Sequence, residues 1–210
     1  MKMIELFQWM SNRTIFRKRM ITNKLEELYK SPFSFLFLYL FLYGFHCIWN
    51  WSEFMSFNRS LELDAIHSGK QISLWSLYPF QIVIVLLVFV LYWFISFSII
   101  FFFSLGETNK EIFRTKNLPF FMSLVRQFFL FVCLLFVGNQ ILGLLQYLEF
   151  YSVLVVLFWF SLFLLFIIKN GDLYRRLFVS ADHSTSFLSH SLGYVNPIVC
   201  VFVVLALANV

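Results

Sequence analysis

Polar side chains at helical spacing in the first apolar segment carry the groups that proton transfer needs. Tyr39, Tyr43, His46, Asn50 and Glu53 follow one another at intervals of four, three, four and three residues, which places all five on one face of a helix. An imidazole and a carboxylate on one face of an apolar helix predict part of a proton path. The same spacing is also typical of a seam between helices, where such groups bond to neighbours, and both interpretations stay open.

A second set of candidates lies in the apolar segment at 119–147. Arg126 and Gln127 stand near its start, where a guanidinium can reach back to lipid headgroups or face a cavity or a partner's carboxylate. Asn139 and Gln140 stand near its other end, where side-chain amides bond across helices. The candidate intramembrane polar residues are therefore His46, Asn50, Glu53, Arg126, Gln127, Asn139 and Gln140.

The polar stretch at 180–190 holds Asp182, His183 and His190 among serines. A hydrolytic triad needs a scaffold that fixes its geometry, and two histidines seven residues apart with one aspartate make a poor metal site. We expect a solvated loop here. The sequence has no nucleotide-binding glycine turn, no HExxH, no CxxC and no paired histidines for haem. It predicts no cofactor, no metal site and no self-contained active site, so an enzymatic role would be at most that of a non-catalytic subunit.

Apolar helices must position these groups, and the composition sets their surroundings. The chain is 60% hydrophobic and 13% charged, whereas soluble domains carry about 25% charged residues, so the bilayer is the expected solvent. Five apolar segments, at 33–49, 79–105, 119–147, 150–168 and 197–210, predict transmembrane helices, because a spanning backbone must bond internally. The predicted fold is an all-α polytopic membrane protein. A basic polar segment with a short surface helix occupies 1–32, and a single transmembrane domain occupies 33–210.

The distribution of lysine and arginine predicts the orientation. Seven lie in 1–32 and three in each of the loops 106–118 and 169–190, whereas the loop 51–78 has two and the turn after the third span has none. With five alternating spans, thirteen of the sixteen basic residues fall on one face. The positive-inside rule then places the N-terminus on the cytoplasmic or matrix side. Topology accounts for the net charge of +5, so we expect no nucleic-acid partner.

A family resemblance begins at 139–147, which reads Asn-Gln-Ile-Leu-Gly-Leu-Leu-Gln-Tyr and is followed by an apolar return helix, Gly171, a basic polar loop and Asn196-Pro197. This order resembles part of ATP synthase subunit a, an organelle-encoded protein in which an Asn and Leu-Leu-Gly-Leu-Leu-Pro-Tyr end the third helix. Gln146 stands where that family has proline, and no arginine follows Arg176. The resemblance, over 139–197, therefore implies a form without the family's proton-transferring arginine helix, and it assigns no functional residue. The stretch 148–150 is also similar to a segment of an organelle-encoded subunit of respiratory complex I.

Small size, five spans, 31 phenylalanines and the lack of an active site of its own favour a subunit of a larger assembly. The phenylalanine excess fits a T-rich coding strand, as in organellar genes. We predict a structural or proton-path subunit of an energy-converting complex of the mitochondrial inner membrane, either ATP synthase or the respiratory chain, with other membrane subunits and lipids as partners. Two alternatives stay open. One is the membrane component of a transporter or export system, and the other is a secretory-pathway membrane protein with Asn58 as a glycan acceptor.

Overall fold

The computed structural model describes residues 31–69, 71–72, 77–104, 110–177 and 183–208, and within these ranges it contains helices and no strand. The helices are α2 (Ser34–Trp49), α3 (Trp51–Ser68), α4 (Ile82–Ser104), α5 (Lys110–Gly143), α6 (Tyr151–Leu177) and α7 (His183–Ala208). The all-helical prediction is confirmed for these residues. The surface helix predicted within 1–32 falls outside them.

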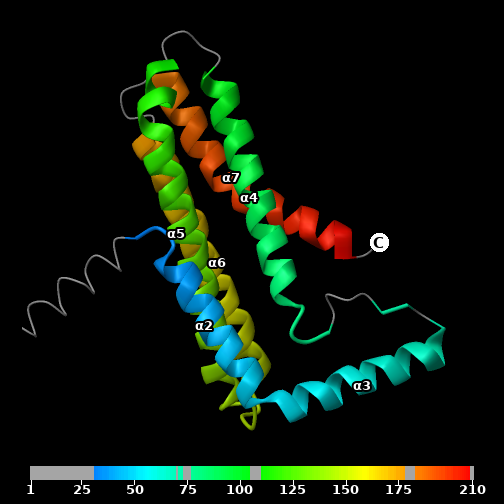
Figure 1. The fold of residues 1–210 in the computed structure, drawn as a ribbon. Coiled ribbons are helices and arrows are strands. Elements are labelled where there is room, and N and C mark those ends of the chain that lie inside the picture. Colours follow the sequence, from blue (N-terminus) through cyan, green and yellow to red (C-terminus); the bar gives the residue numbers. More distant parts are fainter. Residues whose placement is uncertain (1–30, 70, 73–76, 105–109, 178–182, 209–210) are drawn as a thin grey trace, which may run out of the picture.

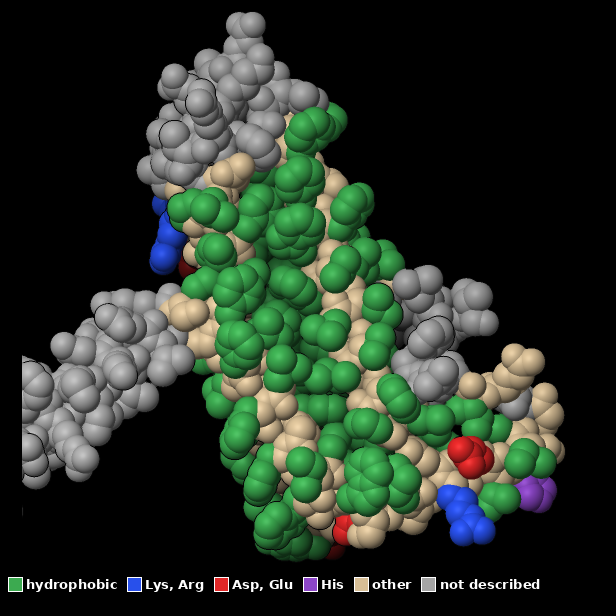
Figure 2. Space-filling model, viewed as in Figure 1, with side chains coloured by type: hydrophobic (Ala, Val, Ile, Leu, Met, Phe, Trp, Pro, Cys, Tyr) green, Lys and Arg blue, Asp and Glu red, His purple; other side chains and the backbone are tan. Residues whose placement is uncertain are grey.

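Three helical stretches are long and apolar enough to cross a membrane, namely Ile82–Phe102, Asn117–Gly143 and Tyr151–Leu177. By length and composition they indicate an integral membrane protein. The apolar stretches Ser34–Trp49 in α2 and Phe187–Val203 in α7 are shorter. Figure 2 shows hydrophobic side chains over most of the described bundle surface, with the visible charged side chains towards its two ends and on α3.

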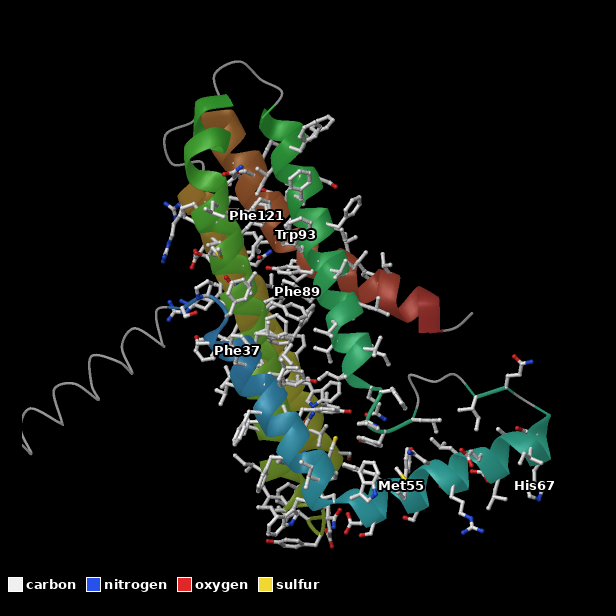
Figure 3. The ribbon with its side chains drawn as sticks, in the orientation of Figure 1. Phe37, Met55, His67, Phe89, Trp93 and Phe121 are labelled. Atoms are coloured by element: carbon white, nitrogen blue, oxygen red, sulfur yellow. The ribbon has the colours of Figure 1, made fainter. Side chains whose placement is uncertain are left out.

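The helices form a bundle around the antiparallel pair α5 and α6 (Figure 1). α2 packs on α5, α7 packs on α6, and α4 packs on both α5 and α7. Because α4 and α6 run opposite to α2, α5 and α7 (Figure 1), successive long helices alternate in direction. Aromatic side chains fill the seams, and Figure 3 shows Phe89 and Trp93 of α4 and Phe121 of α5 lying between these two helices. The Trp93 and Phe121 ring centroids are 5.5 Å apart.

Several helices extend beyond the apolar segments that predicted them, so the loops expected at 106–118 and 169–190 are wrong in large part. α5 already begins at Lys110 and has Pro119 inside it, α6 continues to Leu177, and α7 begins at His183 with Pro197 inside it. Hydropathy marks only the part of a helix that lipid can cover. The expected spans at 119–147 and 197–210 begin at prolines, yet both helices continue through them, because a bundle can satisfy the carbonyl that an internal proline leaves unbonded.

The loop predicted at 51–78 is also wrong in its first part, because Trp51–Ser68 forms α3. The chain breaks at Asn50, whose φ of −103° and ψ of 26° are not helical, and α3 then runs outward across the direction of the bundle (Figure 1). α3 ends at Ser68, and Gly69 caps it with a φ of 65°, a left-handed backbone conformation that favours glycine. The Asn58 side chain fixes α3, since its Nδ2 donates to the Tyr78 carbonyl at 2.8 Å and its Oδ1 accepts from the Tyr78 N–H at 3.0 Å.

Candidate functional site

Several buried polar groups of the bundle gather where α4, α6 and α7 meet. Each helix contributes two residues spaced four apart, which places both on one helical face. Every member is at most 4% exposed. We call this set the polar cluster, and its members are Tyr92, Ser96, Asn170, Tyr174, Asn196 and Cys200.

One half of the polar cluster supplies a hydrogen bond that the backbone of α7 lacks. The Tyr92 hydroxyl donates to Asn170 Oδ1, and Asn170 Nδ2 donates to the Gly193 carbonyl at 2.5 Å. In a regular helix that carbonyl would accept from the residue four positions later, which here is Pro197 and has no N–H. The Asn170 amide therefore supplies the donor that Pro197 lacks, and α7 continues through the proline.

The other half of the polar cluster is built around Asn196. Its Nδ2 donates to Ser96 Oγ at 2.7 Å and to the Tyr174 hydroxyl at 3.3 Å, and its Oδ1 accepts from Cys200 Sγ at 3.6 Å. Ser96 Oγ in turn donates to the Tyr92 carbonyl at 2.8 Å. All six side chains thus have partners, and all are neutral types. Such an arrangement fixes helices, which is the role of satisfied polar groups in an apolar interior.

Two glycines bring α6 and α7 close together beside the polar cluster. A Cβ at Gly171 of α6 would lie 2.4 Å from Cε1 of the Tyr194 ring on α7. A Cβ at Gly193 of α7 would lie 2.9 Å from the Tyr174 side chain on α6. Each helix therefore packs a tyrosine against a glycine of the other helix. The tyrosine lies so close that a side chain larger than hydrogen at the glycine would clash with it.

An apolar groove of about 630 Å³ adjoins the polar cluster and shares Tyr92 and Cys200 with it. Its floor is formed by α5, through Phe128, Phe131 and Leu135. α6 contributes most of its wall, from Val155 to Phe166, and α7 closes one end with Pro197, Cys200 and Val201.

The predicted stripe of the first apolar segment is divided by the break at Asn50. His46 and Asn50 do meet, since Asn50 Nδ2 donates to His46 Nδ1 at 2.9 Å. The His46 ring lies edge-on to Phe54 and Phe136, with centroids 5.2 and 5.5 Å away. Glu53 is exposed on α3. The single helical face expected for all five residues is therefore wrong beyond Asn50, because α3 takes a different direction.

The upper members of the stripe pack against α5. Tyr39 and Tyr43 are buried, and their ring centroids lie 6.1 and 6.3 Å from that of Phe136. The Tyr43 hydroxyl donates to the Pro79 carbonyl at 2.7 Å. These contacts are those of a seam between helices, and the proton path stays a prediction.

The predicted residues of α5 lie in separate places. The Arg126 guanidinium carbon is 5.9 Å from the centroid of Phe35, near the start of α2. Gln127 Nε2 donates to the Phe166 carbonyl at 3.4 Å. At the other end, Asn139 Oδ1 accepts from the Trp159 indole N–H at 2.8 Å, and Gln140 is exposed. None of the seven predicted residues belongs to the polar cluster.

The solvated loop expected at 180–190 is wrong from His183 onward, because α7 begins there. Asp182 lies outside the described residues, and the His190 ring centroid lies 4.6 Å from that of Tyr194. Across the described part of the chain, no group of three or more His, Cys, Asp or Glu side chains could hold a metal ion.

Sequence analysis missed the polar cluster, although a signal for it exists. Tyr92 and Ser96, and again Asn170 and Tyr174, are polar pairs four apart, and Asn196 directly precedes a proline. Each pair alone is too common to stand out. Only the antiparallel packing of α4 and α6 against α7 unites them.

No family model, no curated protein and no solved structure matches the chain.

Proposed function

We propose that the chain is a non-catalytic subunit of a membrane complex, in which its fixed helical bundle serves as a packing partner for other subunits. The observation that carries this proposal is the polar cluster. The cluster is buried and neutral, and each of its side chains is hydrogen bonded within the bundle. A side chain that moves protons or attacks a substrate must be able to contact the proton or the substrate and must change its charge or protonation state. The side chains of the polar cluster instead make their hydrogen bonds to one another and to the backbone, and so hold α4, α6 and α7 together.

The outer face of α2 carries exposed aromatic side chains to which a partner subunit could bind. Phe37, Phe41, Phe45 and Trp49 recur every four residues and are 57–76% exposed. Neighbouring rings stack, with centroids 6.5 Å apart for Phe41 and Phe45 and 5.8 Å apart for Phe45 and Trp49. Exposed aromatic side chains in one row offer a large contact area to an apolar neighbour.

The proposed placement has five spans, formed by α2, α4, α5, α6 and α7, with the N-terminus on the cytoplasmic or matrix side. The alternating directions of these helices support it, as does the bias of lysine and arginine. Arg126 lies beside Phe35 near the start of α2, so its side chain can reach the interface on the basic side. α3 then lies along the opposite surface, as amphipathic interfacial helices do.

The proposed host is the mitochondrial inner membrane, and its energy-converting complexes are the proposed assemblies. The phenylalanine-rich composition and the resemblance to ATP synthase subunit a support this assignment. The test is a native gel of membranes solubilised in a mild detergent, followed by mass spectrometry of the band that contains the chain. Co-migration with ATP synthase or respiratory subunits is the expected result. Migration as a free monomer would overturn the proposal.

A further inference from the structure

We propose that the groove beside the polar cluster binds the paired acyl chains of one diacyl membrane lipid. The inference concerns the groove alone, and it holds whichever complex contains the chain.

The groove exists because α4 and α6 stand apart over the floor formed by α5. Within the described residues the backbones of α4 and α6 make no close approach, and Tyr92 bridges them only at the level of Asn170 and Phe166. Below that level α7 runs away from α6 (Figure 1). The hollow opens sideways at Val156 and Phe160, each 65% exposed, where hydrocarbon would surround the bundle.

The volume of the groove is too small to enclose a helix. A cylinder as narrow as a helix, about 10 Å across, would use 630 Å³ in roughly 8 Å of its length, which is about five residues. A spanning helix from a partner is far longer than that. A flexible hydrocarbon chain needs far less volume per unit length than a helix and can lie within the groove.

The chemistry of the lining selects a neutral occupant. None of the described residues that line the groove is charged. Its two aromatic donors are already used, since the Tyr92 hydroxyl donates to Asn170 and the Trp159 indole N–H donates to Asn139. A headgroup, a carboxylate or a peptide backbone would leave polar atoms unpaired there, whereas a methylene chain leaves none.

A neighbouring hollow accounts for a second chain. It has a volume of about 320 Å³ and an entirely apolar lining. It shares Phe160, Phe163 and Val201 with the groove, so the two hollows have a common wall between α6 and α7. Two apolar hollows along one wall match the two acyl chains of one lipid.

The probe is a phosphatidylcholine with a diazirine midway along one acyl chain, placed in nanodiscs with the full-length protein. After irradiation, mass spectrometry would map the adducts on α5. Phe131 and Leu135 form the floor of the groove, whereas Leu134 of the same helix does not line it and is exposed. We expect adducts on the two floor residues, at a level at least equal to that on Leu134.

Val156→Phe narrows the mouth, and Val153→Phe is its matched control, because Val153 is similarly exposed at 56% on the same helix but does not line the groove. Val156→Phe should lower floor labelling about tenfold, as expected for the loss of roughly two buried methylene contacts. Val153→Phe should leave it unchanged. Equal floor labelling in both variants, or labelling confined to Leu134, would overturn the proposal. A fatty acid that carries a diazirine tests whether two chains are needed. If it labels Phe131 and Leu135 as strongly as the phosphatidylcholine does, and competes with the phosphatidylcholine for these residues, the diacyl assignment would be overturned.

Discussion

Asn170 of α6 donates its side-chain amide to the carbonyl of Gly193 in α7, with 2.5 Å between Nδ2 and O. Pro197 cannot serve that carbonyl from within α7, because proline has no N–H. One helix therefore completes the backbone hydrogen bonding of the next. The same asparagine also accepts from Tyr92 of α4, so a single side chain joins three helices around the proline.

Asn170→Ala should destabilise the protein by about 2 kcal/mol, because it leaves the Gly193 carbonyl and the Tyr92 hydroxyl buried without these partners. Pro197→Ala returns an N–H to α7, so the double variant should lose less stability than the sum of the two single variants. Unfolding of detergent-solubilised protein, followed by circular dichroism, would give the four stabilities of this cycle. Additive losses would show that Asn170 does not act through the carbonyl that Pro197 leaves unbonded.

Gly171→Ala should destabilise the contact between α6 and α7 by about 2 kcal/mol, the usual cost of overpacking, because its methyl group would lie 2.4 Å from the Tyr194 ring. Tyr194→Ala removes that ring, so adding Gly171→Ala to it should cost little more. The matched control is Gly44→Ala in α2, where a Cβ would have no neighbour within 4 Å. That change should be neutral or stabilising by up to about 1 kcal/mol, since alanine favours helix. Equal effects at the two glycines would refute the close packing inferred for Gly171.

His46→Ala should lower stability by about 2 kcal/mol through lost packing against Phe54 and Phe136, while His46→Phe should restore most of it because the ring contacts are kept. Proton flux through the assembled complex should be the same in His46→Phe and in the wild type. The measurement is dye-monitored flux in proteoliposomes, normalised to assembled complex. Flux lost in His46→Phe, despite normal assembly, would instead support a proton path through the histidine.

Asn58 should remain without glycan when the chain is expressed in a secretory-pathway host, although Asn58-Arg59-Ser60 has the acceptor pattern. Both polar atoms of its amide already bond to the backbone of Tyr78, and the stacked Phe54 and Tyr78 rings, 3.9 Å apart, hold that arrangement. A gel-mobility assay before and after glycosidase treatment would check this, with Asn58→Gln as the unglycosylated reference. A mobility shift in the wild type alone would favour the secretory-pathway alternative.

Hydropathy predicted the centres of α4, α5 and α6 because lipid demands long apolar helices. It did not predict where they end, since polar residues such as Lys169 and Arg175 continue α6 outside the apolar stretch without breaking it. It also began the last span at residue 197, whereas α7 continues through Pro197, because the group that compensates for the missing N–H lies on another helix. Asn170 and Gly193 are 23 residues apart, and no local pattern connects them.

Rarity in apolar segments singles out residues such as His46 and Arg126, but it does not single out the members of the polar cluster. Tyrosine and serine are too frequent in such segments to be noticed singly. What distinguishes Tyr92 and Ser96 is burial, and burial depends on which faces of α4 meet α5 and α7. Packing between helices decides which face of α4 is buried, and this packing cannot be read from the amino-acid sequence alone.

α2 has 16 residues and is therefore only about 24 Å long, whereas the 34 residues of α5 extend over about 51 Å. A hydrocarbon layer of about 30 Å matches neither helix. With α2 spanning the bilayer, as in the proposed placement, the leaflets beside it would be drawn together, and lipids with shorter tails would fit best there. The protein would thus impose an asymmetric thickness on the bilayer, thinner on its α2 flank than elsewhere around the bundle.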